Sequence, residues 1–171
     1  VNNATEENVL RQNQIRKVSE MEKALLDLTL AAMDAIVDAD SGKVSLELKR
    51  HMSEAQTALL KGLDELEDAA DTAEEKRIIN AQRPNVLKLD KLVSQDLVSA
   101  IEKKWDSKDK QNTAFAEMDD AIDALSREIE GDLAAFAASV TDELNESQAA
   151  VQDQIGSSMT LSLLAYLLTI G

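Results

Sequence analysis

The chain has 171 residues, a formal net charge of −15, no cysteine and one proline. So acidic a surface would repel the phosphates of nucleic acids, and the lack of cysteine excludes disulfides, zinc–thiolate sites and thiol nucleophiles. Good helix formers such as Ala, Leu, Glu, Lys and Gln dominate the composition. We therefore expect an all-α protein.

The first apolar repeat predicts a helix over residues 5–38. Its apolar residues recur at spacings of three and four, which is the heptad pattern of a helix in a bundle. They are Val18, Met21, Leu25, Leu28, Ala32 and Ala35. The following sequence DADSGK, with two Asp, a Ser and a Gly, predicts a turn that ends this helix.

The same helix carries a second apolar stripe, formed by Leu26, Leu30, Met33 and Val37. A helix in a monomeric bundle needs only one apolar face. We interpret the second stripe as the interface of a symmetric homodimer, in which this helix packs on its own copy. The alternative is that this half of the helix is central in its own bundle and buries both stripes.

The second helix is expected over residues 44–70 and the third over 72–104. Thr72 and Glu75 have the spacing of a capping box, in which each side chain accepts a hydrogen bond from a free backbone N–H. The third helix is therefore expected to begin at Thr72.

Pro84 interrupts the pattern of the third helix, because proline removes a backbone hydrogen bond. A kink, or a break between Gln82 and Asn85, is expected there. The alternative is that the second helix continues to Arg83 and the third begins after Pro84.

The fourth helix is expected over residues 109–156 and has no strong helix breaker before Gly156. All connections between the predicted helices are short, so neighbouring helices must be antiparallel. Residues 1–156 are therefore expected to form one domain, an antiparallel up-down-up-down four-helix bundle with long first and fourth helices.

Residues 157–171 carry no charge, and Thr160, Ser162 and Thr169 are the only polar residues between Met159 and Ile170. A bilayer crossing needs about 20 predominantly apolar residues. We interpret the segment as the start of a second transmembrane helix, with another hydrophobic span preceding the first helix. The alternative is a buried core helix.

Three segments resemble the four-helix-bundle ligand-binding domain of bacterial methyl-accepting chemotaxis proteins. They are LTLAAMDAIVDADSG closing the first helix, DTAEEKRIINAQ opening the third, and MTLSLLAYLL following the fourth. The resemblance spans nearly the whole chain but includes no sharp motif. It implies a homodimeric transducer in the inner membrane with this sensor domain in the periplasm. A small molecule would bind near the membrane-distal part of the dimer interface, and the fourth helix would slide to transmit the signal.

Sensor histidine kinases carry similar domains, so the output module stays open. A membrane-tethered helical adaptor without a ligand is a further alternative from another class. The flanking sequence of the gene would separate these possibilities.

The residues that would bind a ligand differ from those of family members that bind carboxylates. Those members use arginines on the distal half of the first helix, whereas residues 25–38 here contain no Arg or Lys. Asp27, Thr29 and Asp34 are the polar groups beside the second stripe, so a cation, an amine or an apolar molecule is the expected ligand. The alternative is that these carboxylates form a solvated helix face.

Asn80 and Arg83, beside Pro84, are a weaker candidate for a second ligand site. The alternative is an ordinary surface arginine. His51 is the only histidine and is expected on the surface of the second helix. We expect no enzymatic activity, no catalytic residue, no cofactor and no metal site, because no nucleophile, phosphate loop or metal-ligand motif stands out.

Overall fold

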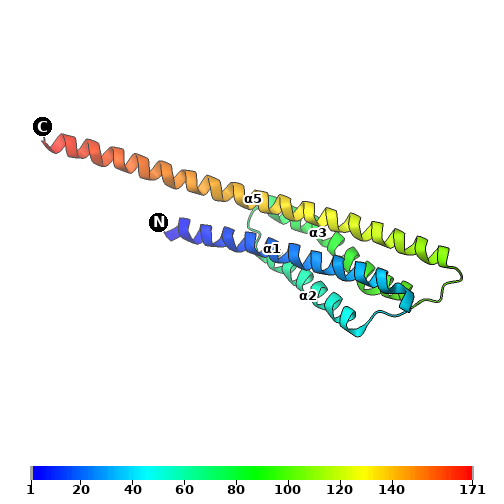
Figure 1. Cartoon of the computed structure of the whole chain (residues 1–171). Coiled ribbons are helices and arrows are strands. Elements are labelled where there is room, and N and C mark those ends of the chain that lie inside the picture. Colours follow the sequence, from blue (N-terminus) through cyan, green and yellow to red (C-terminus); the bar gives the residue numbers. More distant parts are fainter. Residues whose placement is uncertain (1, 171) are drawn as a thin grey trace.

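The computed structural model describes the backbone of residues 2–170 and the side chains of residues 6–150 and 152. Four helical rods make up this part of the chain, and it contains no strand (Figure 1). The rods are α1 (Asn2–Val37), α2 (Leu46–Ala69), α3 (Ala73–Lys91) with its extensions, and α5 (Lys108–Ile170). The expected fold class, an antiparallel four-helix bundle with long first and fourth helices, is confirmed.

The rods form a ring in which each one packs mainly against two neighbours, and the extensions of α3 also contact α1. Helix α1 packs against α2 and α5, and α3 packs against the same two helices from the other side. Figure 1 shows the N-terminal end of α1 and the C-terminal end of α5 on the same side of the bundle. Helix α5 runs on alone beyond the other three rods at that end.

Side-chain caps fix where the inner helices begin. The Ser45 hydroxyl accepts a hydrogen bond from the N–H of Leu48 (3.1 Å), which starts α2. The Thr72 hydroxyl accepts one from the N–H of Glu75 (3.2 Å), which starts α3. The return bond of the capping box is displaced by one residue, because the Glu75 carboxylate accepts from the N–H of Asp71 (3.0 Å).

Helix α3 continues through Pro84 without a break, so of the two expected outcomes the break is wrong and the kink stays a prediction. The alternative, a second helix that reaches Arg83, is also wrong, since α2 ends at Ala69. The irregular hydrogen bonding comes about two turns later, in the π-helical segment η2 (Leu92–Leu97). The short helix α4 (Val98–Glu102) then completes the third rod.

The predicted core stripe of α1 is buried along its length. The second stripe is not: Leu26 is 56% exposed, Leu30 50% and Val37 80%, while Met33 is half-buried. The alternative that both stripes are buried within one bundle is therefore wrong. The second stripe is an apolar surface of the single chain.

The predicted membrane segment, residues 157–171, has a helical backbone up to Ile170, but its side chains lie outside the described residues. The expectation that it starts a transmembrane helix stays a prediction. Within the described residues, no helix combines the length and apolar character that a membrane crossing requires.

Candidate functional site

A groove of about 500 Å³ lies between α1 and α2, beside the second stripe. Asp27, Leu30 and Asp34 of α1 line it from one side, and His51 and Glu54 of α2 line it from the other. The structure thus brings two of the predicted ligand residues together with one residue of the second stripe. Heptad spacing explains the arrangement, because residues three and four apart share one helix face.

The groove is predominantly acidic. The carboxylates of Glu20, Asp27, Asp34 and Glu54 line it, against the single ammonium group of Lys23. That ammonium group is paired with Asp27, with 2.9 Å between Nζ and Oδ2. Glu20 is paired with Arg16 and Glu54 with Arg50, so Asp34 is the lining carboxylate without an ion pair among the described residues. Its charge favours a cationic ligand, and Leu30, Ala31 and Ala55 supply apolar contact area beside it.

Thr29, the third residue predicted beside the second stripe, does not line the groove. It is half-buried and faces α5, where its hydroxyl lies 3.0 Å from the hydroxyl of Ser126. It also donates a hydrogen bond to the carbonyl oxygen of Leu25. Thr29 therefore joins α1 to α5.

Asn80 and Arg83 lie elsewhere on the bundle. The Arg83 guanidinium pairs with Asp64 at 2.7 Å and with Glu67, both on α2. The hydrogen bond that Arg83 donates to Asp64 is the main reason that the pKa of Arg83 is raised. Asn80 is exposed on the surface of α3. Arg83 thus links α3 to α2, away from the groove.

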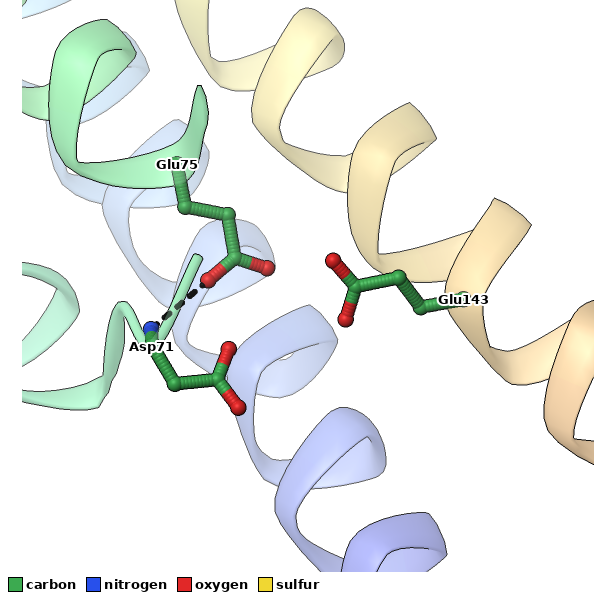
Figure 2. A group of neighbouring side chains, drawn as sticks. All are labelled: Asp71, Glu75 and Glu143. Carbon is green, nitrogen blue, oxygen red and sulfur yellow. Dashed lines mark hydrogen bonds between the residues drawn. The ribbon is translucent and has the colours of Figure 1, made fainter. Parts of the chain in front are cut away.

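A second polar site lies at the turn between α2 and α3, where Asp71 and Glu75 face Glu143 of α5 (Figure 2). One carboxylate oxygen from each residue lies within 4.8 Å of the other two. Arg11 of α1 approaches the same group. Its Nη1 lies 2.8 Å from Asp71 Oδ1 and its Nη2 lies 2.5 Å from Glu143 Oε2. We call Arg11, Asp71, Glu75 and Glu143 the carboxylate cluster.

Glu75 is the buried centre of this cluster. Its side chain has no exposed surface. Oε2 accepts hydrogen bonds from the amide of Gln14 (3.2 Å) and from the N–H of Asp71 (3.0 Å). Oε1 is also buried and has no hydrogen-bond partner among the described residues.

The environment shifts the pKa values of the three carboxylates in different directions. Burial raises the pKa of Glu75 and that of Glu143, because it disfavours the charged form. The hydrogen bond from Arg11 lowers the pKa of Asp71. Arg11 therefore stabilises the charge of Asp71, while the other two carboxylates are incompletely compensated.

Sequence reasoning recognised Glu75 as a capping residue only and missed the cluster. A signal was present, since Glu75 lies four residues before the core residue Ile79 and Gln14 lies four residues before Val18. Both positions continue the buried stripe of their helix, and both residues are fully buried. Polar residues on core positions of two helices, near one end of the bundle, indicate a buried polar site there.

Comparisons with protein-family models, with curated proteins and with solved structures find no match to this chain.

Proposed function

We propose that this chain is the extracytoplasmic sensory domain of a transmembrane chemoreceptor. It pairs with a second copy through the second stripe of α1 and binds a small cationic molecule in the adjacent groove. It passes the signal along α5. The observation that carries this proposal is the exposed apolar stripe lying directly beside an acidic groove.

The exposure of the second stripe supports the pairing. Leu26, Leu30 and Val37 are each at least half exposed in the single chain. Burial of a large apolar side chain contributes roughly 1.5–3 kcal/mol. A symmetric pair buries each such residue twice, so even a narrow stripe gives a substantial driving force for association.

The ligand class follows from the groove. Asp27 and Asp34 stand one on each side of Leu30 along α1, so a ligand between them would lie at the edge of the pairing surface. An amine or another organic cation complements the carboxylates and is also able to contact apolar side chains. A ligand in this position contacts the interface, and its binding is therefore coupled to the geometry of the pair.

The signalling route follows from α5. This helix extends from Lys108 to Ile170 without interruption and leaves the bundle at the end where α1 begins (Figure 1). An uninterrupted helix transmits a displacement that a loop would absorb. The same architecture on a histidine kinase would use the same route, and the output module decides between the two.

The pairing is tested by single-cysteine crosslinking of the full chain, which has no cysteine of its own. Leu30→Cys is expected to form a disulfide-linked dimer under mild oxidation, because position 30 lies near the symmetry axis of the proposed pair. Leu87→Cys on α3 is the matched control, since Leu87 is 48% exposed and Leu30 is 50% exposed. Equal crosslinking of both variants would indicate random collision and overturn the pairing.

A second measurement uses sedimentation of the full chain in a mild detergent. Leu30→Lys combined with Met33→Lys is expected to convert dimers into monomers, whereas Leu87→Lys leaves them paired. A wild-type chain that is monomeric at all concentrations would instead favour the ligand-free adaptor.

A further inference from the structure

We propose that the carboxylates of Asp71, Glu75 and Glu143 bind a divalent metal cation, of the class of Ca²⁺, that joins the α2–α3 turn to α5. The site is separate from the groove and from the second stripe, and the inference does not rest on the sensory function proposed above.

The spacing of the carboxylates fits such an ion. Each residue offers one oxygen, and the three oxygens lie within 4.8 Å of one another. Oxygen ligands lie 2.3–2.6 Å from Ca²⁺, so two ligands on opposite sides of the ion are about 4.6–5.2 Å apart. The three oxygens are therefore close enough to share one ion with small adjustments of the side chains.

The oxygen that lacks a partner indicates where the ion would lie. Glu75 is fully buried, and its Oε1 has no hydrogen-bond partner within the described part of the chain. Figure 2 shows the carboxylate of Glu75 directed toward that of Glu143, with the carboxylate of Asp71 beside them. Two acceptors that face each other require either a cation or a proton between them, because a buried charged oxygen without a partner is costly.

Arg11 does not supply the cation that is required between the carboxylates of Glu75 and Glu143. Its guanidinium contacts Asp71 Oδ1 and Glu143 Oε2 but not Glu75, whose Oε1 is left without a partner among the described residues. Three carboxylates and one guanidinium also leave two negative charges uncompensated. A divalent cation balances both charges, whereas a single proton balances only one.

Access and affinity follow from the position of Asp71. Its side chain is 45% exposed, so water can reach the site and complete the coordination of the ion. With only three protein ligands and a guanidinium nearby, the expected dissociation constant is on the order of 10⁻⁴–10⁻³ M, as in extracellular calcium modules.

The ion would connect directly the two parts of the chain that Arg11 already bridges through Asp71 and Glu143. Asp71 and Glu75 belong to the α2–α3 turn, and Glu143 belongs to α5 just before that helix leaves the bundle (Figures 1 and 2). A bound ion fixes the position of α5 relative to the turn, and its release permits α5 to shift.

The test is thermal unfolding of the EDTA-treated full chain at pH 7.5, with and without 5 mM CaCl₂ or MgCl₂, at constant ionic strength. Mass action at several times the dissociation constant is expected to raise Tm of the wild type by about 2–4 °C. Glu143→Gln is expected to abolish the rise. Asp142→Asn is the matched control, because it removes an adjacent exposed carboxylate of α5 and should leave the rise intact.

Three results would overturn the proposal. The first is no rise with either metal ion, and the second is an equal rise in Glu143→Gln, which would indicate general screening of the acidic surface. The third is a wild type whose Tm rises on acidification from pH 7.5 to 5 in EDTA but does not respond to metal, which would show that the cluster holds only a proton. If Glu143→Gln does not fold, Glu75→Gln replaces it, and calorimetric titration of CaCl₂ into both chains gives the same comparison.

Discussion

The buried polar side chains of this bundle each bond to a helix other than their own. Gln14 of α1 donates to the carbonyl oxygen of Ala69 in α2 (2.7 Å), and Gln82 of α3 lies 3.4 Å from the carbonyl oxygen of Ile129 in α5. Both glutamines are fully buried. An apolar core contact tolerates sliding, whereas a buried hydrogen bond is satisfied in one register only. These residues therefore define how the rods align.

The pH dependence of stability is the first prediction at the scale of a residue. Burial raises the pKa of Glu75 above its ordinary value of 4.5, so the folded chain holds this proton more tightly than the unfolded chain. The stabilisation that comes from the protonated form is complete below pH 4.5 and is lost as pH rises through the folded-state pKa. Glu75→Gln removes the titrating group and should flatten the curve of unfolding free energy against pH.

The measurement is denaturant unfolding in EDTA between pH 5 and 7.5. At pH 7.5 Glu75→Gln is expected to be more stable than the wild type by about 1–3 kcal/mol, because it no longer buries an incompletely compensated charge. Glu143 contributes with the same sign, since burial also raises its pKa, so part of the slope should persist. A variant with the wild-type slope would contradict this account of Glu75.

At the scale of the element, two glycines inside helices have opposite surroundings. A Cβ atom added to Gly62 in α2 would lie 2.4 Å from Cγ of Met21, whereas one added to Gly131 in α5 meets no atom within 4 Å. Met21 is fully buried in α1, so it has little room to move aside. Gly62 thus lets α1 and α2 approach closely, and Gly131 has no such role.

Alanine substitution at each glycine is therefore expected to act in opposite directions. Gly131→Ala should stabilise the chain by about 0.5–1 kcal/mol, because alanine favours the helix. Gly62→Ala gains the same helix preference but overpacks the contact with Met21 at a cost of about 1–3 kcal/mol, so a net loss is expected. Equal gains for both variants in thermal unfolding would show that Met21 repacks freely.

The helices, their caps and their core stripes could be predicted where they depend on residues that are close together in the sequence. The core stripe of α1 and the cap at Thr72 depend on residues a few positions apart, and the structure has both, with the return bond of the capping box moved to Asp71. The passage of α3 through Pro84 agrees with the helix expected over residues 72–104 and not with the competing expectation of a break. Packing of buried residues on both sides, such as Gln82 and Val86, holds the rod together despite the lost hydrogen bond.

The carboxylate cluster could not be predicted because its contacts are distant in sequence. Arg11 and Asp71 are 60 positions apart, and Glu143 comes from yet another rod. The sequence reveals only that polar residues occupy core positions. The alignment of the rods decides which of these polar residues contact one another. The groove was easier to anticipate, since Asp27, Leu30 and Asp34 share one helix face.

At the scale of the whole molecule, the two candidate sites contact different halves of the bundle. The groove lies along the part of α1 that carries the second stripe, and the carboxylate cluster lies at the α2–α3 turn, beyond which only α1 and α5 continue (Figure 1). Under the two proposals, a ligand in the groove would act on the pairing of two chains, and an ion in the cluster would act on the position of α5. The long helix is the element that both are able to influence.

The ligand class is the last prediction, and it concerns the paired molecule. A thermal-shift screen of the full chain against amines, amino acids, organic acids and aromatic compounds is expected to find stabilisation by amines, since a bound ligand raises Tm by mass action. Asp27→Asn combined with Asp34→Asn should remove this stabilisation, because the variant loses two of the carboxylates that line the groove. Asp68→Asn, an exposed carboxylate of α2 that does not line the groove, should leave it unchanged and so excludes general attraction of amines to an acidic protein. Stabilisation by organic acids alone would contradict the expectation that the acidic groove prefers a cation. If no compound in the panel raises Tm, a partner protein or a structural role for the second stripe would be favoured.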